Sequence, residues 1–311
     1  MSRPRAATSP EGARRATSVV IEVPATSANV GVGFDCLGMA LDLVARFSFE
    51  TASLTRIDGC PERFRGADNL VWTSFLETCR RLRREPRPLH ITIDSPIPLS
   101  GGLGSSSACV VAGVIAAQEL VGDGLDRDQA LDIACELEGH PDNVAPAILG
   151  GLVSSFVDRG RTHPVRLEVA PNVSFVAIAP PYELRTADAR EVMPRKVSLE
   201  TAVWQVGHCV AAVHALVTGD LELFSAAASD RLHEPYRAPL IPDYEALRRT
   251  ALAAGASAYL ISGSGATMLA VCDGERVARR VADAVLGMVE NRVEGLWVRT
   301  LSARSAGARV A

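Results

Sequence analysis

The chain has 311 residues, enough for about two domains of roughly 150 residues each. Nearly half of the residues (48%) are apolar and 22% are charged, proportions typical of a globular protein with a real core. The formal net charge of -4 argues against a chain that binds nucleic acid or an anionic membrane through its overall charge.

The first half of the chain begins with residues 1–17, which are rich in Arg, Ala, Ser and Pro. This segment lacks the apolar core of a secretory signal and is expected to be a disordered tail. The β-branched run 18–23 predicts a strand, which the segment 24–29 (PATSAN) is expected to break. The pattern then predicts a strand at 41–50, a helix at 69–82, a strand at 89–94 with Leu89, Ile91 and Ile93 inward, helices at 106–120 and 126–138, the latter capped by Asp126, and a glycine turn with a strand at 148–157.

The second half predicts a mixture of strands and helices after a change of pattern near residues 158–172. We therefore expect one domain at 18–160 and a second at 161–305. The predicted elements are strands at 165–169, 173–179, 258–262, 267–272 and 295–301, and helices at 199–218, 221–228, 243–254 and 275–290.

The cysteines and the apolar runs indicate the compartment. Seven cysteines, odd in number and never spaced as C-x-x-C, argue against a disulfide framework and against a structural zinc site. A reducing, cytoplasmic location is the simplest interpretation. The longest apolar run, 108–117, is far shorter than the ~20 residues that span a bilayer, so we expect no contact with a membrane.

The segment 98–108 is the strongest local signal for chemistry. It follows a predicted strand, precedes a predicted helix and reads Pro98, Leu99, Ser100, Gly101, Gly102, Leu103, Gly104, Ser105, Ser106, Ser107, Ala108. Glycines let backbone N–H groups approach an anion, and a helix N-terminus adds partial positive charge, so the pattern is typical of a phosphate-binding loop. It is neither a Walker loop nor a dinucleotide fingerprint. A plain turn before a buried helix is the alternative.

Two further clusters carry polar groups that can converge on a ligand. Residues 136–144 (ELEGHPDNV) end a helix and enter a loop, and their carboxylates suit Mg²⁺, a hard ion that prefers oxygen ligands. The alternative is a solvated helix end followed by an ordinary turn. Residues 29–38 (NVGVGFDCLG) suggest a tight loop that presents Asn29 and Asp35, and an anionic Asp35 can bind an amino group. A hairpin with capped turns is the alternative here.

Two arginines and one glycine turn complete the candidate features. Arg190 and Arg237 lie in polar, Pro-flanked stretches where a guanidinium fork can hold a carboxylate, although most arginines are only surface charges. The turn 262–267 (SGSGAT), between two predicted strands, can bring its backbone close to another group or form a simple hairpin.

The order of these motifs resembles the GHMP kinase superfamily. The resemblance rests on PLSGGLGSSSA at 98–108 and the turn GSGAT at 263–267, together with PATSANVGVGFDCLG at 24–38, EGHPDNVAPA at 138–147, TADAR at 186–190 and HEPYR at 233–237. It covers about residues 18–302. It implies an α+β fold with two domains, of which the N-terminal one is like domain 2 of ribosomal protein S5 and binds ATP, while the C-terminal one is ferredoxin-like.

The resemblance also implies a reaction and its site residues. ATP, with Mg²⁺, would phosphorylate the side-chain hydroxyl of L-homoserine to give O-phospho-L-homoserine, a step towards threonine, and the enzyme would be a homodimer. The implied roles are ATP binding by residues 98–108 and Asn69, metal binding by Glu138 and Ser106, substrate binding by Asn29, Asp35, His140, Arg190 and Arg237, and catalysis by Asp142, Asn143 and Thr186.

Several alternatives stay open from the sequence. Glu136 is a rival metal ligand to Glu138, and Asp142 is either a general base or a residue that only assists. The substrate is L-homoserine or another small hydroxylated amine or acid, such as threonine or shikimate. A nucleotide sensor without turnover is the alternative from another class of protein, and we disfavour it because the phosphate loop and the carboxylates are intact.

Overall fold

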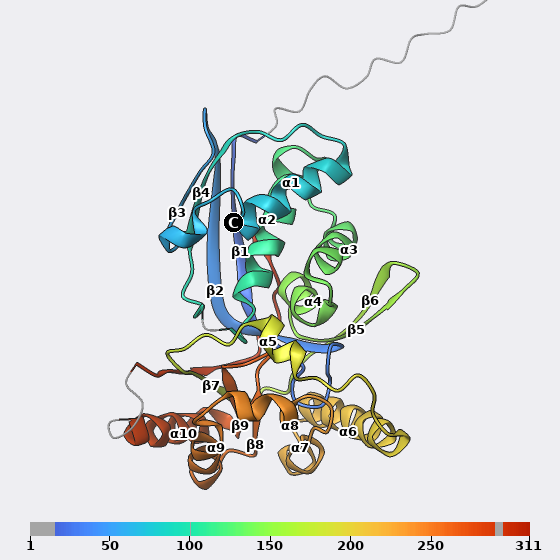
Figure 1. Cartoon of the computed structure of the whole chain (residues 1–311), viewed down its shortest axis with the longest axis vertical. Helices are drawn as coiled ribbons and strands as arrows, with labels where there is room; N and C mark the ends of the chain where they lie inside the picture. The colour runs from blue at the N-terminus through green and yellow to red at the C-terminus, as the bar shows by residue number, and fades with distance from the viewer. Residues whose placement is uncertain (1–15, 100, 290–294) are drawn as a thin grey trace, which may run out of the picture.

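The computed structural model describes residues 16–99, 101–289 and 295–311, which form two β-sheets with helices packed on them (Figure 1). Most of the expected tail (residues 1–15), Ser100 of the glycine-serine segment and the last position of the helix expected at 275–290 lie outside the described residues. The first sheet and its helices occupy the upper half of Figure 1, and the second sheet with its helices occupies the lower half.

The first sheet has β1 and β2 at its centre, in the strand order β11-β1-β2-β4-β3. Its long strands are β1 (Ser18–Ala28) and β2 (Leu37–Thr51), and its other strands are β3 (Arg56–Asp58), β4 (Leu89–Asp94), β5 (Leu152–Asp158), β6 (Arg161–Leu167) and β11 (Arg309–Val310). The expected break at 24–29 is wrong, because β1 continues to Ala28. Pro24 instead coincides with a shift in the β1–β2 register, where a missing N–H is tolerated.

Strands β5 and β6 form an antiparallel hairpin that joins the first sheet through the pairing of β5 with β2. The expected second domain, 161–305, therefore begins with a strand that pairs within the first sheet. The last strand, β11, also returns there, since Arg309 and Val310 pair with Glu22 and Ile21 of β1.

Four helices pack together beside the first sheet: α1 (Leu70–Leu82), α2 (Ser105–Leu120), α3 (Arg127–Glu138) and α4 (Pro141–Leu149). Asp126 caps α3 as expected, because its side chain accepts a hydrogen bond from the Gln129 N–H. The expected loop after residue 138 is wrong. After Gly139 and His140, the chain starts α4 with Pro141, which suits a first helical turn because that turn needs no intrahelical N–H.

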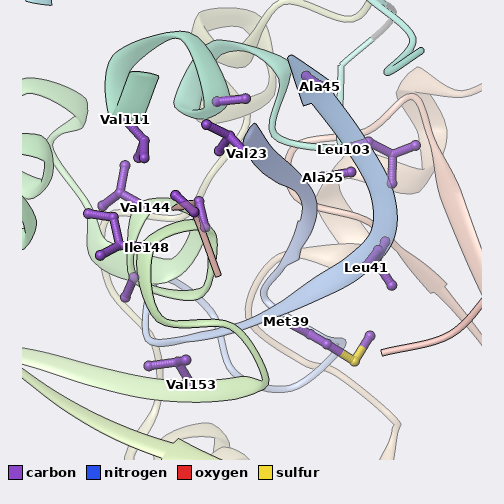
Figure 2. Packing of buried hydrophobic residues seen from close by; sticks show 14 of the residues in the cluster. Val23, Ala25, Met39, Leu41, Ala45, Leu103, Val111, Val144, Ile148 and Val153 are labelled. Carbon is purple, nitrogen blue, oxygen red and sulfur yellow. The ribbon is translucent and has the colours of Figure 1, made fainter. Parts of the chain in front are cut away.

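The core of this half lies between the central strands and helices α2 and α4 (Figure 2). Val23 and Ala25 of β1 and Met39 and Leu41 of β2 are fully buried there, and the residues between them are buried as well, so both faces of the two strands are covered at this point. Helix α2 is buried on nearly every side and consists largely of small apolar residues. Gly113 allows α1 to approach closely, since a Cβ at this position would lie 2.3 Å from the Val71 carbonyl oxygen.

The second sheet is fully antiparallel, in the order β10-β7-β9-β8. Its elements are β7 (Val173–Ala179), α9 (Tyr244–Ala253), β8 (Ala258–Ile261), β9 (Met268–Asp273), α10 (Gly274–Val289) and β10 (Trp297–Leu301), which is the βαββαβ succession of a ferredoxin-like fold. All residues of β7 are buried, because Phe175 and Ala177 join one hydrophobic cluster while Val176 and Ile178 join the other.

The remaining helices are inserted between β7 and α9: α5 (Thr186–Glu191), α6 (Leu199–Thr218), α7 (Leu221–Ala227), α8 (Glu234–Arg237) and the short 3₁₀ turn η2 (Ala238–Leu240). Another 3₁₀ turn, η1 (Glu62–Phe64), lies between β3 and α1. Helices α5 and α8 were not predicted. By length and apolar composition α6 could cross a membrane, and one of its faces packs on α7.

Candidate active site

One pocket collects residues from both halves of the chain, next to α5. It contains about 540 Å³ of empty space, part of it open to solvent. Its lining comes from the end of β1, the glycine-serine segment, the junction of α3 and α4, α5, α8 and the turn after β8: Ala28, Asn29, Asp35, Gly101, Gly102, Gly104, Ser105, Ser106, Glu138, His140, Asp142, Asn143, Thr186, Arg190, Arg237, Gly263 and Ser264.

The glycine-serine segment forms the N-terminal end of α2 within this pocket. Gly101, Gly102 and Gly104 all have positive φ angles (88°, 92° and 66°), a backbone region that glycine adopts without strain. Gly104 is the N-cap, and no side chain caps the first turn of α2. The N–H groups of this turn therefore face the pocket with the positive end of the helix dipole, an arrangement that suits a phosphate group.

The turn after β8 holds this loop from behind. The Thr267 hydroxyl donates a 2.6 Å hydrogen bond to the Gly101 carbonyl oxygen, and the Ser262 hydroxyl donates to the carbonyl oxygen of Gly102. A Cβ at Gly101 would lie 2.6 Å from the Gly265 carbonyl oxygen, so the two backbones are in direct contact. The expected close approach of the 262–267 turn to another group is thus present, and the neighbour is the glycine-serine segment.

If the segment holds the phosphates of ATP, as the resemblance implies, replacing Gly104 by alanine is expected to lower kcat/KM for ATP by at least about 10²-fold, since reacting groups misplaced by ~1 Å lose that much. The new Cβ would lie 2.0 Å from the Thr26 Oγ1 atom, and φ is unfavourable for a side chain. Steady-state kinetics at varied ATP concentration measure this effect. Gly124→Ala is the matched control, because φ is +99° there but nothing lies within 4 Å of the added Cβ. Equal losses in the two variants would contradict a specific role for Gly104.

Glu138 faces the start of α2 from the C-terminal end of α3. Its Oε1 atom accepts hydrogen bonds from the Ser107 hydroxyl at 2.7 Å and the Ser106 hydroxyl at 3.3 Å. Glu136 points elsewhere, because its carboxylate pairs with Arg81 at 2.6 Å. Of the two rival carboxylates, only Glu138 lines the pocket.

The oxygen atoms around Glu138 fit a magnesium ion. A carboxylate and two serine hydroxyls are hard ligands, and Mg²⁺ is usually held by one or two carboxylates plus phosphate oxygens and water. A second group, formed by Asp35, His140 and Asp142, also has ligand atoms within 4.8 Å of one another. Its two carboxylates already contact Arg190 and His140, so the Glu138 group is the better candidate.

His140, Asp142 and Asn143 lie together at the start of α4. The His140 Nδ1 atom is 2.5 Å from the Asp142 Oδ1 atom, and Asp142 is almost completely buried. Burial lowers the pKa of His140, but the hydrogen bond and the charge of Asp142 outweigh burial, so this pKa lies above its usual range. The Asn143 Oδ1 atom accepts a 2.7 Å hydrogen bond from the Thr26 hydroxyl, which fixes the orientation of its amide.

The His140–Asp142 contact predicts a pH dependence of stability. Because folding raises the pKa of His140, the contact stabilises the fold fully below the unfolded pKa of about 6.5 and loses this effect as pH rises through the folded value. The stability advantage of the wild type over His140→Gln is therefore expected to shrink from pH 6 towards pH 9. Urea denaturation at several pH values measures the difference. An advantage that grows with pH would contradict this assignment.

Asp35 and Arg190 form a two-pronged ion pair in the pocket. The Arg190 Nη2 and Nη1 atoms lie 2.9 Å and 3.1 Å from the Asp35 Oδ1 and Oδ2 atoms. Both residues were expected to bind opposite ends of a substrate, and they instead contact each other directly. A zwitterion can replace this contact, because its ammonium group matches Asp35 and its carboxylate matches Arg190.

The loop that carries Asp35 is held in an uncommon backbone conformation. Asn29, Val30 and Asp35 have φ angles of 67°, 44° and 57°, and positive φ is especially unfavourable for a β-branched residue such as Val30. Asn29 stabilises the loop, since its amide donates to the Gly263 carbonyl oxygen at 2.8 Å and accepts from the Asp35 N–H at 3.0 Å. Strained backbone of this kind concentrates at functional sites.

Arg237 reaches the pocket from α8 and is only 2% exposed. Its Nη1 atom donates to the Gly263 carbonyl oxygen at 3.0 Å, and Nε donates to the Ala189 carbonyl oxygen at 3.3 Å. Among the described residues, no carboxylate pairs with it within 4.0 Å. Burial, followed by repulsion from Arg190, lowers its pKa. A buried cation without an acidic partner is costly, and a bound anion relieves that cost.

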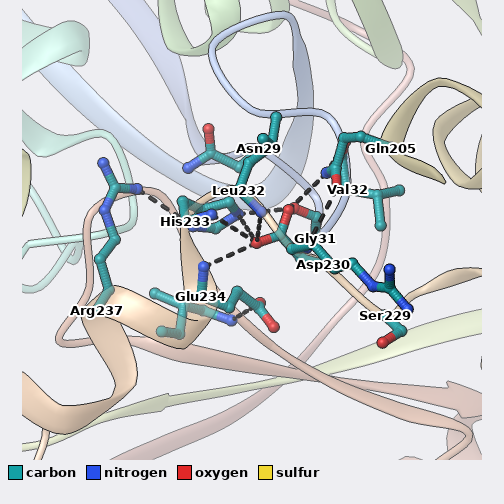
Figure 3. Close-up of polar contacts among 12 residues, drawn as sticks. Asn29, Gly31, Val32, Gln205, Ser229, Asp230, Leu232, His233, Glu234 and Arg237 are labelled. Carbon is teal, nitrogen blue, oxygen red and sulfur yellow. Dashed lines mark hydrogen bonds and ion pairs between the residues drawn. The ribbon is translucent and has the colours of Figure 1, made fainter. Parts of the chain in front are cut away.

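A buried polar network connects Arg237 and the 29–35 loop to α6 and α8 (Figure 3). The Asp230 carboxylate accepts hydrogen bonds from the N–H groups of Leu232, His233 and Glu234 and from the Gln205 amide. The same amide donates to the Val32 carbonyl oxygen at 2.7 Å, which joins α6 to the loop.

His233 links the loop to Arg237 within this network. Its Nε2 atom is 2.7 Å from the Gly31 carbonyl oxygen, and its Nδ1 atom is 3.3 Å from the Arg237 Nη1 atom. Burial lowers the pKa of His233, so the neutral ring donates from Nε2 and accepts at Nδ1. Burial raises the pKa of the neighbouring Glu234 to about 8, and its carboxyl group accepts from the Ile261 N–H.

Some of the expected site residues lie outside this pocket. Pro98 and Leu99 line a neighbouring hollow with Tyr182 and Trp297, while Leu103, Ser107 and Ala108 are buried. Both ends of the Asn69 amide are occupied, because it caps α1 through the Val71 N–H and donates to the Phe64 carbonyl oxygen.

The sequence reasoning missed four contributors to the site: Thr26, His233, Gly263 and Ser264. Each lies in a motif that was recognised without a role for that position. Ser264 contacts Thr186 of α5, with 3.3 Å between the two hydroxyl oxygens. The run of glycine and serine at 262–267 was the signal that could have placed Gly263 and Ser264 in the pocket.

The fold and the pocket agree with the comparison to protein families. A family model described as GHMP kinases N terminal domain matches residues 69–151, and another, described as GHMP kinases C terminal, matches residues 212–290. Together they cover more than half of the chain, which therefore belongs to the GHMP kinase family.

Similar proteins place the chain more narrowly within that family, among the homoserine kinases. A homoserine kinase of Synechococcus sp. is 38% identical over 309 residues, 94% of this chain and 96% of that protein. The crystal structure of a homoserine kinase from Cytophaga hutchinsonii superposes with a TM-score of 0.85 at 32% identity and covers 95% of this chain and 98% of that one. A mevalonate kinase of Methanococcus jannaschii, at a TM-score of 0.66 and 15% identity, shares the fold.

Proposed function

We propose that this chain catalyses the ATP-dependent phosphorylation of the side-chain hydroxyl of L-homoserine, which gives O-phospho-L-homoserine and ADP, a step of threonine biosynthesis. The relatives that it resembles over most of its length carry the name homoserine kinase. The observation that carries the substrate is the buried cation of Arg237 in the same pocket as Arg190 and Asp35, because this set of charges matches an amino acid zwitterion.

The ATP end of the pocket is assigned to the start of α2. We propose that the N–H groups of Gly101 to Ser106 hold the phosphates, and that Glu138 and Ser106 hold Mg²⁺. When bound, Mg²⁺ neutralises charge on the transferring phosphoryl group. The oxygen ligands at Glu138, and the uncapped first turn of α2 beside them, support this assignment.

The homoserine end of the pocket is assigned to five side chains. Arg237 and Arg190 would hold the carboxylate, and Asp35 would hold the ammonium group once its contact with Arg190 opens. Asn29 would act mainly by fixing the position of Asp35, since both ends of its amide already have partners. His140, whose ring contacts Asp142, would border the same end of the pocket.

Catalysis is proposed to depend mainly on positioning and charge neutralisation. Phosphoryl transfer passes through a loose transition state in which the protein has little covalent chemistry to perform. Asn143 and Thr186 would orient the attacking hydroxyl and the γ-phosphate. Asp142, buried and bonded to His140, would assist by ordering the start of α4 rather than by acting as a strong base.

A substrate panel tests the proposed activity. The release of ADP is measured with L-homoserine, threonine, shikimate and mevalonate at saturating ATP and Mg²⁺. We expect kcat/KM to favour L-homoserine over each of the other substrates by well over 10-fold, where a factor of 10 corresponds to about 1.4 kcal/mol. A smaller preference would point to another small hydroxylated substrate, and tight ATP binding without any product would point to a nucleotide sensor.

The remaining expectations about partners and location are proposals as well. We propose a cytoplasmic enzyme that acts on small molecules without a nucleic acid or membrane partner, in line with its net charge of -4. We further propose that it is a homodimer.

A further inference from the structure

Helix α6 carries an apolar stripe on the face that points away from the rest of the molecule. The exposed residues of this stripe are Leu199 (81%), Val203 (65%), Val206 (67%) and Val210 (68%). Single exposed apolar residues are common on protein surfaces, but contiguous rows of them are not. The opposite face of α6 packs inward through Gln205, Ala212, Ala215 and Leu216. The lower right of Figure 1 shows α6 at the margin of the molecule.

The spacing of the stripe is that of a coiled-coil seam. The six positions Leu199, Val203, Val206, Val210, Val213 and Val217 are separated alternately by four and three residues, which is the a/d repeat of a heptad. A seam of this kind buries its apolar side chains only against a second helix. Val213 is partly buried against the core of its own chain, but no helix among the described residues covers the rest of the seam, since four of its members remain about two-thirds or more exposed.

The seam is symmetric about the level of His208, as any six positions with this alternating spacing are, so it can pair with a second copy of itself in the antiparallel direction. Positions 199 and 217, 203 and 213, and 206 and 210 are equally distant from residue 208. When two copies of α6 pair antiparallel across a two-fold axis at this point, each pair of positions meets, as a and d positions do in antiparallel helices. Gly207 lies beside the axis with nothing within 4 Å of an added Cβ, so the two helices can approach closely there.

The charges at the ends of α6 agree with the same arrangement. Arg195 and Lys196 precede the helix, Asp220 and Glu222 follow it, and all four are exposed. In the antiparallel pair, the basic residues before α6 of one copy come to the same end as the acidic residues after α6 of the other. A parallel pair would place like charges together, which disfavours that arrangement.

We infer that the α6 seam (Leu199, Val203, Val206, Val210, Val213 and Val217) binds the α6 seam of a second copy of this chain in an antiparallel, two-fold symmetric arrangement. This inference assigns a surface and a register to the proposed homodimer and does not depend on the catalytic activity. A membrane is the less favoured occupant, because the buried face of α6 holds the Gln205 amide in hydrogen bonds to Val32 and Asp230 that insertion would break.

A complementary pair of variants tests the register. Val206→Lys and Val210→Glu each place a charge against an apolar residue of a second identical copy, so each variant alone is expected to dimerise at least ~100-fold more weakly. When the two variants are mixed in equal amounts, they can form a mixed dimer. At one contact of this dimer the introduced lysine of one chain meets the introduced glutamate of the other, and at the second contact valine meets valine. Sedimentation velocity should then show dimers of about twice the 32.9 kDa chain mass in the wild type and in the mixture.

Controls separate this arrangement from other occupants of the seam. Val157→Lys, at an exposed valine of β5, should leave the dimer intact, and so should a chain that lacks residues 1–15. A monomeric wild type, single variants that still dimerise or a mixture that stays monomeric would overturn the inference. So would flotation of the wild type, but not of Val206→Lys, with vesicles of phosphatidylcholine and phosphatidylglycerol. Circular dichroism of each variant confirms that it is folded.

Discussion

Replacing Glu138 by glutamine is expected to lower kcat by about 10³-fold, or ~4 kcal/mol of transition-state stabilisation at 1.36 kcal/mol for each factor of ten. The physical reason is the loss of negative charge at the proposed Mg²⁺ site, since removal of a single preorganised electrostatic group commonly lowers kcat by 10²–10³-fold. Glutamine keeps an oxygen acceptor for Ser106 and Ser107, so the start of α2 should remain ordered. Steady-state kinetics over a Mg²⁺ titration measure the effect.

The matched control for this prediction is Glu136→Gln. Glu136 lies two residues earlier on the same helix, but its carboxylate pairs with Arg81 at the surface. Exposed ion pairs of this kind contribute only about 0–1 kcal/mol to stability, so activity should stay within a few fold of the wild type. If Glu136→Gln were the inactive variant and Glu138→Gln the active one, the assignment of the metal ligand would be wrong.

The second large effect is expected at Arg237. Arg237→Met keeps most of the side-chain volume but removes the buried cation. This variant should raise KM for L-homoserine by about 10²–10³-fold, because breaking a buried charge pair costs ~3–5 kcal/mol. KM for ATP should change little, because Arg237 lies at the other end of the pocket from α2 in the proposed arrangement. Initial rates at varied homoserine and varied ATP separate the two effects.

A substrate without a carboxylate makes the Arg237 prediction specific. 3-Aminopropan-1-ol is L-homoserine with its carboxylate removed, so Arg237→Met should turn it over about as well as the wild type does. Arg276→Met, at an exposed position of α10, controls for general effects of losing a guanidinium. An equal loss with both substrates would indicate that Arg237 supports the fold of the pocket rather than the binding of a carboxylate.

Much of the fold could be predicted from the sequence because its elements are strongly patterned. The expected α6, at 199–218, and the expected β4 and β7 have the bounds that the structure shows. Proline caused the main errors. Pro24 was taken to end β1, although a shift in register accommodates it, and Pro141 was taken as part of a turn although it begins α4. A single sequence does not reveal the tertiary contacts that decide between these outcomes.

The site was predicted as a set of residues, but its internal contacts were not. Local motifs placed Asp35, Glu138 and Arg237 in one pocket only through a resemblance, because they lie far apart in the chain. No local pattern indicates that Arg190 pairs with Asp35, or that His233 bridges the loop and Arg237. The same limit applies to Asn69, whose amide caps a helix and whose suggested role near the nucleotide remains a prediction.

The hydrogen bonds that hold the proposed phosphate loop from behind have a consequence for synthesis of the chain on the ribosome. Gly101 and Gly102 are translated long before Thr267 and Ser262, whose hydroxyls bind their carbonyl oxygens. Strand β1 likewise gains its outer neighbour only when Arg309 and Val310 have been made. A growing chain therefore carries the glycine-serine segment without its support until the second sheet has emerged, and we expect the nucleotide binding proposed for this segment only late in translation.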